Sequence, residues 1–474
     1  MENLKQAVNP YLPSWEYVPD GEPYVFDGRV YVYGSHDFFN GDVYCMGDYV
    51  CYSTPVDDLG AWRYEGVIYR KDQEPGNDDL QGNLYAPDVA RGADGRYYLF
   101  YTISNDCTVS VAVCDTPAGR YEFYGHVHYA DGTLLGKREG DDPQFDPGVL
   151  REGDRTYLYT GFCGFKDPNR HGPMCTVLGP DMLTIIEEPV FIAKSSAYSS
   201  EADSYFGHEF FEAPSIRKKG EYYYFIYSSI KFHELCYMMS KNPKEGFEYK
   251  GVLVSGGDLH IDTYKPAEKC AFYTANNHGS MVEINGDWFI FYHRHTNGTN
   301  YSRQGCFEKL TPNADGTFKQ AEMTSCCSVK PLKGEGEYPT YIACNLFNDI
   351  DMTYVAWSGW MDDRFAKITQ EGGDGDENYG YIANMRDKTV AGFKYFDFKG
   401  LKKISVKTKG YANGELVIKT KWDGEVVGTV PIGYANVWHY TEADVKIPDG
   451  VSALYFEYRG QGHLQFGAFN LITG

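Results

Sequence analysis

Short, strongly aromatic runs with alternating character recur along the first 330 residues of the chain, separated by turns that contain Gly or Pro. The segment 222–229, YYYFIYSS, is typical, because it follows a turn that contains Gly220. Runs of this length between Gly and Pro turns are typical of β-strands. No sustained helical period is present in this region. The pattern therefore predicts a domain built from β-strands.

Five copies of a longer pattern organise these strands. Each copy has an ionisable residue, a glycine 7 or 8 positions later, and then an aromatic run; the glycines are Gly28, Gly95, Gly153, Gly220 and Gly286. A second half follows each copy and consists of two strands around a proline-containing turn, with the prolines at Pro55, Pro117, Pro180, Pro243 and Pro312. Two hairpins make about four strands per copy, and radial repetition of such units protects the sheet edges. The repeat therefore predicts a five-bladed β-propeller.

The ionisable residues of the five copies are Asp20, Asp88, Asp146, Glu212 and His278. The first strand of each propeller blade lines the central channel, so residues at similar offsets lie at similar heights. We therefore expect these five side chains to form a ring at one mouth of the channel. Carboxylates crowded in this way repel one another, which raises the pKa of at least one of them.

An acid that faces a carboxylate base across a sugar-sized gap is the apparatus of glycoside hydrolysis, and a gap of roughly 6.5–9.5 Å would favour inversion. Simpler interpretations exist for single members of the ring. Asp20 and Asp146 precede Gly or Pro and would also suit turns, and His278 is either a hydrogen-bonded core residue or a metal ligand. The acidic segment 370–380 resembles part of a calcium loop but lacks the terminal Glu, so we expect a solvated loop there.

The chain of 474 residues is too long for one ordinary core, and the repeat stops after Met323. Residues 1–330 are predicted to form the propeller, residues 331–345 a linker and residues 346–474 a β-sandwich. Its candidate strands are 392–398, 402–411, 414–422, 427–433, 438–447, 452–460 and 464–472.

Charge and composition limit the classes of partner that the protein is expected to bind. The net charge of −22 disfavours nucleic acid and anionic membranes, and no run of 18 apolar residues is present. The opening MENLKQAVNP lacks the apolar centre of a secretion signal. The twelve cysteines form no C-x-x-C pair, and Cys326 and Cys327 are adjacent, so a reduced, cytoplasmic protein is predicted. Exposed faces of the 42 tyrosines would suit sugar rings.

Several motifs in order resemble glycoside hydrolase family 43. They are NPYLP from residue 9, PDGEPYVFDGRVYVYGSHD from residue 19, YAPDV from residue 85, FEAPS from residue 211 and NNHGSMV from residue 276. The resemblance covers roughly residues 9–330. It implies that Asp20 is the general base, that Asp88 tunes the pKa and orientation of its partner, and that Glu212 is the general acid. Because DG replaces the usual DP after the base, Glu22 stays an alternative to Asp20, although the offset of 13 from Asp20 to Tyr33 favours Asp20.

The same resemblance implies substrate-binding residues. His278 matches a channel histidine that is often associated with a Ca²⁺ or Na⁺ ion, so one such ion is predicted in the channel, with no organic cofactor. Arg303 resembles the arginine that reaches the sugar near the acid. Phe38 is predicted to stack on the terminal sugar, and Asp146 is predicted to bind substrate or water.

The C-terminal region resembles a family 6 carbohydrate-binding module. It would bind sugar through Trp422, Trp438 or Tyr455, or it would only pack against the propeller, and packing is favoured for an intracellular enzyme that acts on short oligosaccharides.

The predicted function is inverting hydrolysis that releases terminal pentoses from plant-polysaccharide-derived oligosaccharides, as a β-xylosidase or α-L-arabinofuranosidase. The alternatives are a galactan- or galactofuranose-active hydrolase of the same family, a sugar-binding propeller without catalysis, and a retaining β-fructosidase-type propeller. The last would need carboxylates about 5–5.5 Å apart.

Overall fold

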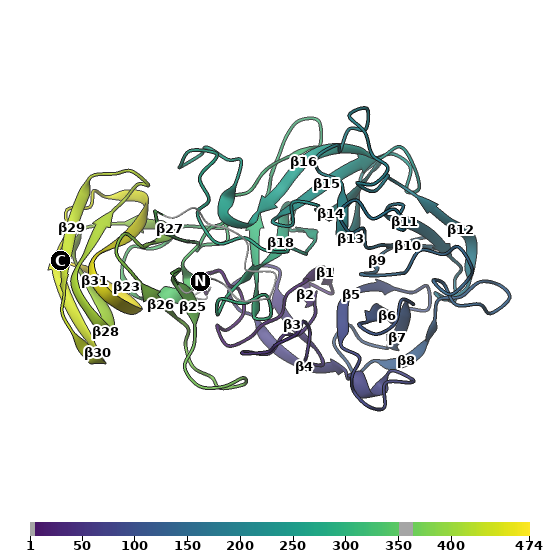
Figure 1. The fold of residues 1–474 in the computed structure, drawn as a ribbon, viewed down its shortest axis with the longest axis horizontal. Helices are drawn as coiled ribbons and strands as arrows, with labels where there is room; N and C mark the ends of the chain where they lie inside the picture. Colours follow the sequence, from purple (N-terminus) through teal and green to yellow (C-terminus); the bar gives the residue numbers. More distant parts are fainter. Residues whose placement is uncertain (1–4, 350–363) are drawn as a thin grey trace.

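Five antiparallel sheets surround a central channel in the larger lobe of the molecule (Figure 1). The computed structural model describes residues 5–349 and 364–474. The first four sheets, blades 1 to 4, each contain four strands in chain order. Blade 1 is β1 (Glu22–Phe26), β2 (Arg29–Tyr33), β3 (Tyr49–Pro55) and β4 (Arg63–Tyr69); blade 2 is β5 (Leu84–Arg91), β6 (Tyr97–Ile103), β7 (Ser110–Cys114) and β8 (Glu122–His126); blade 3 is β9 (Gly148–Glu152), β10 (Arg155–Thr160), β11 (Met174–Leu178) and β12 (Ile185–Phe191); and blade 4 is β13 (Phe210–Lys219), β14 (Tyr222–Ser229), β15 (Glu234–Ser240) and β16 (Glu248–Ser255).

Blade 5 is smaller than the repeat predicts. Its sheet has three strands, β17 (Met281–Ile284), β18 (Asp287–His295) and β19 (Arg303–Lys309). The segment expected to supply the fourth strand forms a separate two-stranded hairpin, β20 (Thr311–Pro312) and β21 (Phe318–Lys319). The five-bladed prediction is confirmed, and four of the five blades have the expected four strands.

The ring closes between blade 5 and the start of the chain. Gly21 and Gly279 form a parallel bridge between the inner segments of blades 1 and 5, and a Cβ atom at Gly279 would collide with the carbonyl oxygen of Phe291. The side chain of Asn9 donates to the Phe307 carbonyl at 2.9 Å and accepts from its N–H at 3.0 Å. The N-terminal segment is therefore fastened along the last strand of the ring.

Neighbouring blades are joined by buried tyrosines that repeat with the fold. The hydroxyl of Tyr33 donates to the carbonyl of Pro117 at 2.7 Å, and that of Tyr159 donates to Pro243 at 2.6 Å. In each case a second strand reaches the proline turn of the next blade, and both ring systems are fully buried. The aromatic ring of each tyrosine thus packs between two blades, while its hydroxyl group makes a hydrogen bond.

The smaller lobe is a single ten-stranded sheet that curls around a buried core (Figure 1). Its strands are β22 (Leu332–Lys333), β23 (Gly336–Pro339), β24 (Asn345–Phe347), β25 (Lys367–Thr369), β26 (Tyr381–Met385), β27 (Val390–Phe398), β28 (Leu401–Lys419), β29 (Val426–Ile432), β30 (Ala435–Asp444) and β31 (Gly450–Thr473). Its core includes Phe393, Phe396, Phe456, Phe466 and Phe469. Three short 3₁₀ helices complete the described structure: η1 (Lys71–Gln73), η2 (Gly256–Asp258) and η3 (Thr340–Ile342).

Two details of this lobe differ from the sequence prediction. The candidate strands 402–411 and 414–422 are one continuous strand, β28, and the last two candidates are likewise one strand, β31. These long strands pair along most of their length and, by curling, connect what was expected to be two separate sheets. The predicted linker 331–345 contributes β22 and β23 to the same sheet, so it belongs to the C-terminal domain.

The two lobes are joined by a buried ion-pair cluster. Lys394 on β27 lies 3.1 Å from Asp258 and 3.2 Å from Glu322. Asp258 follows the last strand of blade 4, and Glu322 follows the hairpin of β20 and β21. Its ammonium group also lies 3.3 Å from the centre of the Tyr264 ring. Asp258 and Lys394 are completely buried, so each charge depends on the other.

The three aromatic residues considered for sugar binding in the C-terminal domain have different surroundings. Trp422 stacks on Phe347 at 4.2 Å and meets the propeller residue Tyr264 edge-on at 6.0 Å. Tyr455 is buried, and Trp438 packs against Tyr381 on the outer part of the sheet. Trp422 and Tyr455 thus serve packing at the domain junction. The acidic segment 370–380 also joins the lobes, because Asp374 accepts a hydrogen bond from the Phe39 N–H at 2.7 Å. Among the described residues, no helix has the length and apolar character needed to cross a membrane.

Replacing Lys394 by Met should strongly destabilise the protein, because it leaves the buried carboxylate of Asp258 without its cation. We expect a loss of about 3–5 kcal/mol in the free energy of unfolding, measured by denaturant or thermal unfolding. The matched control is Lys403→Met, which removes an exposed ion pair with Glu442 and should cost less than about 1 kcal/mol. Equal losses in the two variants would contradict the role of the cluster.

Candidate active site

A cavity of about 570 Å³ lies where the inner segments of all five blades converge. Its described lining consists of Asp20, Tyr44, Cys45, Tyr85, Ala86, Phe145, Asp146, Phe162, Phe211, Glu212, Phe232, Ala275, Asn276, His278, Asn300 and Arg303. Asp20, Asp146, Glu212 and His278, four of the five members of the predicted ring, are in this set. The spacing of the repeats thus brings together residues that are far apart in the chain.

Asp88, the fifth predicted member, is not among the described residues that line the cavity. Its position in blade 2 is taken by Tyr85 and Ala86, which lie earlier on the same strand, β5. Asp88 instead lies deeper, where Tyr24 donates to its Oδ1 at 2.6 Å and the Val149 N–H donates to its Oδ2 at 2.7 Å. Burial raises the pKa of Asp88, and its hydrogen bonds connect strands of blades 1, 2 and 3.

The hairpin of blade 2 explains this difference. In blades 1, 3, 4 and 5 the inner hairpin has a two-residue turn, for example between Phe26 and Arg29. In blade 2 the strands close at Arg91 and Tyr97, which leaves a five-residue loop. Gly95 lies inside that longer loop. Asp88, which was chosen by counting back from Gly95, therefore lies only three residues before the end of β5. Asp20, Asp146 and His278 lie six residues before the ends of their strands.

Asp20 is buried next to cationic and imidazole groups. The guanidinium of Arg303 donates to its Oδ1 at 2.9 Å, and Nδ1 of His293 lies 3.3 Å from the same oxygen. Burial alone would raise the pKa of Asp20, but Arg303 and His293 outweigh burial and hold the pKa well below its ordinary value. Asp20 is therefore the carboxylate of the cavity that stays ionised.

Glu22, the alternative to Asp20, has a different environment. Its Oε2 lies 2.6 Å from Nη2 of Arg217 in a buried ion pair, and Ser215 donates to the same oxygen at 3.1 Å. Burial, followed by the neighbouring charge of Asp88, raises the pKa of Glu22 to about 8. Glu22 is not among the described residues that line the cavity, so the geometry favours Asp20 over Glu22.

Arg303 is held in place by Asp37, a residue that the sequence analysis did not single out. The Nε and Nη2 atoms of Arg303 donate to the two Asp37 oxygens at 2.8 and 2.9 Å, a bidentate contact that fixes the guanidinium plane. Phe38, the next residue, was predicted to stack on sugar, yet it is not among the described residues that line the cavity. Its ring lies edge-on to His36 at 6.1 Å.

Glu212 and Asp146 are the two other carboxyl groups that line the cavity. Burial, followed by the charge of Asp20, raises the pKa of Glu212 to about 7. Burial, followed by the charge of Glu212, raises the pKa of Asp146 well above its ordinary value. Two buried carboxyl groups whose charges repel each other favour a state in which at least one of them keeps its proton near neutral pH. The cavity therefore combines an ionised carboxylate with a protonated acid.

The backbone is strained where these side chains enter the cavity. Asp20 and Asp146 have φ angles of 59° and 47°, and Ala213, next to Glu212, has a φ of 63°. Residues other than Gly seldom adopt this left-handed region, although Asp tolerates it better than most. Such outliers persist where the surrounding structure enforces them and are common at functional sites.

His278 is buried between the carboxylates. Its Nδ1 lies 3.9 Å from Asp20 and 3.7 Å from Asp146, and burial lowers its pKa to about 4. A Ca²⁺ ion takes about six to eight oxygen ligands, whereas these two carboxylates are the acidic groups that face His278 in the described chain. One layer deeper, Arg217 already supplies positive charge beside Glu22. A Ca²⁺ or Na⁺ ion beside His278 would therefore take most of its ligands from water, so the predicted ion stays a prediction and no chemical step is assigned to one.

The sequence analysis also missed an aromatic wall. Tyr85, Phe145, Phe162, Phe211 and Phe232 form a chain of edge-to-face contacts with ring centres 4.6 to 5.5 Å apart. Two of them directly precede ring carboxylates in the sequence, Phe145 before Asp146 and Phe211 before Glu212, and that adjacency was the available signal. Aromatic surface of this kind suits the apolar face of a sugar.

Comparisons with known proteins find relatives along most of the chain. The family model for glycosyl hydrolases family 43 matches residues 26–318. A xylosidase/arabinosidase from Thermoclostridium stercorarium is 63% identical over 471 residues, 99% of both chains. A xylosidase/arabinosidase from Bacteroides ovatus is 27% identical over 320 residues, which are 60% of this chain and 87% of the relative.

Solved structures share the fold. A family 43 arabinoxylan arabinofuranohydrolase from Bacillus subtilis, solved with cellotetraose, covers 99% of both chains with a TM-score of 0.52 and 19% identity. A family 43 β-xylosidase/α-arabinofuranosidase from a compost microbial metagenome, solved with xylotriose in a calcium-free form, has a TM-score of 0.52 and 25% identity. It covers 67% of this chain and 98% of its own.

Proposed function

Because the chain belongs to glycosyl hydrolase family 43, we propose that this inverting glycoside hydrolase releases terminal xylose and arabinofuranose residues from short plant-derived oligosaccharides. The observation that carries the proposal is that Asp20 and Glu212 line one aromatic cavity with their pKa values shifted in opposite directions, downward for Asp20 and upward for Glu212. The 63% identity to a xylosidase/arabinosidase along nearly the whole chain supports the choice of pentoses.

In the proposed reaction, the ionised Asp20 accepts a proton from a water molecule as the water oxygen attacks the anomeric carbon. Glu212 donates its proton to the glycosidic oxygen as the bond from that oxygen to the anomeric carbon breaks. One displacement of this kind inverts the configuration and leaves Asp20 protonated and Glu212 ionised. Proton exchange with solvent then restores both groups. The aromatic wall would orient the sugar by stacking.

Asp146, rather than Asp88, is proposed to keep Glu212 protonated. Asp146 shares the cavity with Glu212, and burial together with the charge of Glu212 raises the pKa of Asp146. Because repulsion between two carboxylates is reciprocal, loss of the Asp146 carboxyl group should make Glu212 easier to ionise. Asp88 is engaged below the floor by Tyr24 and by the N–H groups of Val89 and Val149. We therefore assign to Asp146 the pKa-tuning role that the resemblance gave to Asp88. Asp146 is a positioning residue, because it acts on the reaction only through Glu212.

The cysteines support a reducing location as part of the proposal. All twelve are free thiols, including the adjacent pair Cys326 and Cys327. Disulfides are the usual staples of secreted proteins, so we propose that the enzyme acts in the cytoplasm on oligosaccharides small enough to be imported.

The first test is a screen of aryl glycosides followed by ¹H NMR of the first-formed sugar. We expect kcat/KM for nitrophenyl β-D-xylopyranoside and α-L-arabinofuranoside to exceed that for the β-D-galactopyranoside by at least about tenfold, a difference of about 1.4 kcal/mol in transition-state stabilisation. The xyloside should release α-xylose first, because the reaction inverts the anomeric carbon. Preference for galactosides would overturn the pentose assignment while leaving the mechanism in place, whereas β-xylose as first product would overturn the mechanism.

The roles of Asp20 and Glu212 are separated by the leaving group. For xylobiose, whose leaving group needs a proton, Glu212→Ala should lower kcat/KM by roughly 10²–10⁴-fold. A dinitrophenyl xyloside leaves without protonation and should recover most of this loss. Asp20→Ala should stay impaired with both substrates, because the water lacks its base. Equal recovery in the two variants would show that the roles are assigned incorrectly.

The pH dependence distinguishes Asp146 from Asp88. Activity requires ionised Asp20 and protonated Glu212, so kcat/KM for xylobiose should fall as the pH rises through the Glu212 pKa of about 7, by about tenfold per pH unit. Asp146→Asn removes a neighbouring carboxyl group, so the pKa of Glu212 should fall and the alkaline decline should begin at lower pH. Asp88→Asn should leave that decline in place and lower the melting temperature instead. The same displacement of the pH profile in both variants would refute the assignment of Asp146.

A further inference from the structure

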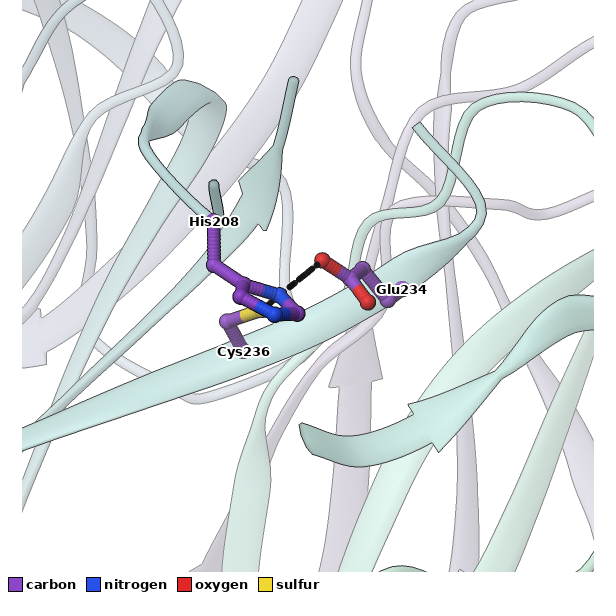
Figure 2. A group of neighbouring side chains, drawn as sticks. All are labelled: His208, Glu234 and Cys236. Carbon is purple, nitrogen blue, oxygen red and sulfur yellow. Dashed lines mark hydrogen bonds and ion pairs between the residues drawn. The ribbon is translucent and has the colours of Figure 1, made fainter. Parts of the chain in front are cut away.

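A second group of side chains, which could bind a metal ion, lies at blade 4, outside the catalytic cavity. Two sets of metal-ligand residues share Glu234: His208 with Cys236, and His233 with His260. In each set, one possible ligand atom per residue lies within 4.8 Å of the others. Figure 2 shows the first set, in which His208 and Cys236 converge on one end of the Glu234 carboxylate.

The first set is already satisfied by hydrogen bonds. Oε1 of Glu234 lies 2.6 Å from Nδ1 of His208 and accepts from Ser229 at 2.6 Å and from Cys236 at 3.4 Å. The other ring nitrogen of His208 lies 3.1 Å from the ammonium group of Lys231. These contacts occupy both nitrogens of His208 and orient the carboxylate, much as outer hydrogen bonds orient metal-ligating carboxylates.

The other carboxylate oxygen has no such contacts. Oε2 of Glu234 is buried and lacks a hydrogen-bond partner in the described chain, and the whole residue is 0% exposed. A buried carboxylate oxygen left without a partner is costly. Among the residues that the structure describes, His233 and His260 offer further ligand atoms near Glu234.

The two histidines are suited to complete a metal site. Nδ1 of His233 lies 2.9 Å from the Ser255 hydroxyl, which leaves Nε2 to bind a cation, and a hydrogen bond at the second ring nitrogen is usual for metal-ligating histidines. His260 is exposed, and its ring centre lies 6.1 Å from that of His233. The site is thus open to solvent at His260 and is fixed at His233 by the hydrogen bond with Ser255.

We propose that Glu234 Oε2, His233 and His260 bind a divalent cation of the zinc class, with water in the remaining position. Two imidazoles and one carboxylate are a ligand set that suits Zn²⁺ and related transition metals better than Ca²⁺ or Mg²⁺. The ammonium group of Lys231 lies next to the ring of His208.

The bound cation would connect two loops behind the catalytic cavity. His233 ends the turn between β14 and β15, and His260 follows η2. Phe232, next to His233, belongs to the aromatic wall, and the His233 carbonyl accepts from the Gly256 N–H at 2.7 Å. A cation at this point clamps the turn that presents Phe232 to the substrate cavity, so we assign it a structural role.

The test uses the full chain, freed of metal, and Zn²⁺ and Co²⁺ as probes. Titration calorimetry should detect one Zn²⁺ per chain, and thermal unfolding should show a higher melting temperature with Zn²⁺. His260→Ala is chosen because the side chain is exposed and its loss should leave the fold intact. It should weaken Zn²⁺ binding by more than the roughly 10–100-fold loss that follows removal of an outer hydrogen bond to a metal ligand, whereas the control His439→Ala, at a partly exposed histidine of the C-terminal domain, should bind as the native protein does.

The spectrum of bound Co²⁺ identifies the ligands. Coordination by two histidines and a carboxylate predicts ligand-field bands without thiolate-to-cobalt charge transfer. A strong charge-transfer band, lost in Cys236→Ser, would move the site to the His208 and Cys236 side of Glu234 and overturn the proposal. Absence of Zn²⁺ binding, or equal affinity in His260→Ala and the native protein, would overturn it as well. None of these readouts depends on the glycosidase activity.

Discussion

The contact between Arg303 and Asp20 is the interaction on which the chemistry of the cavity depends. Asp20, Asp146 and Glu212 experience the same burial, which by itself would favour the neutral form of all three. Arg303, together with His293, reverses that outcome for Asp20, because its guanidinium is held by Asp37 and donates to Asp20 at 2.9 Å. One fixed cation therefore turns three similar acids into a base and an acid pair.

The same principle is repeated one layer down the channel. Arg217 pairs with Glu22 at 2.6 Å and packs 4.4 Å from the Tyr24 ring, and Tyr24 in turn donates to Asp88. Charges buried in this way are tolerated because each has a partner and further hydrogen bonds. A propeller channel lined by acids is thus stabilised by guanidinium groups that the protein carries itself, and the cavity rests on a floor whose charges are already balanced.

Spacing along the chain was sufficient to predict the propeller and to bring Asp20, Asp146, Glu212 and His278 to one place. It failed where local geometry broke the period. The five-residue hairpin loop between Arg91 and Tyr97 displaced Asp88 from the ring, and no counting rule reveals a loop length in advance. Phe38 and the aromatic wall depend on which way loop side chains point, which is set by tertiary packing. The long strands β28 and β31 were divided in the prediction at residues 412–413 and 461–463, although the strands continue through both positions.

The way in which the ring closes has a bearing on how the enzyme is made. Asp20 comes from the first blade, whereas His278 and Arg303 come from the last, and the segment around Asn9 is fastened along β19. During synthesis Asp20 is therefore made long before its partner Arg303, and the two can pair only after more than half of the chain has left the ribosome. A nascent or prematurely terminated chain has no working centre, so catalysis begins only when the two ends of the propeller meet.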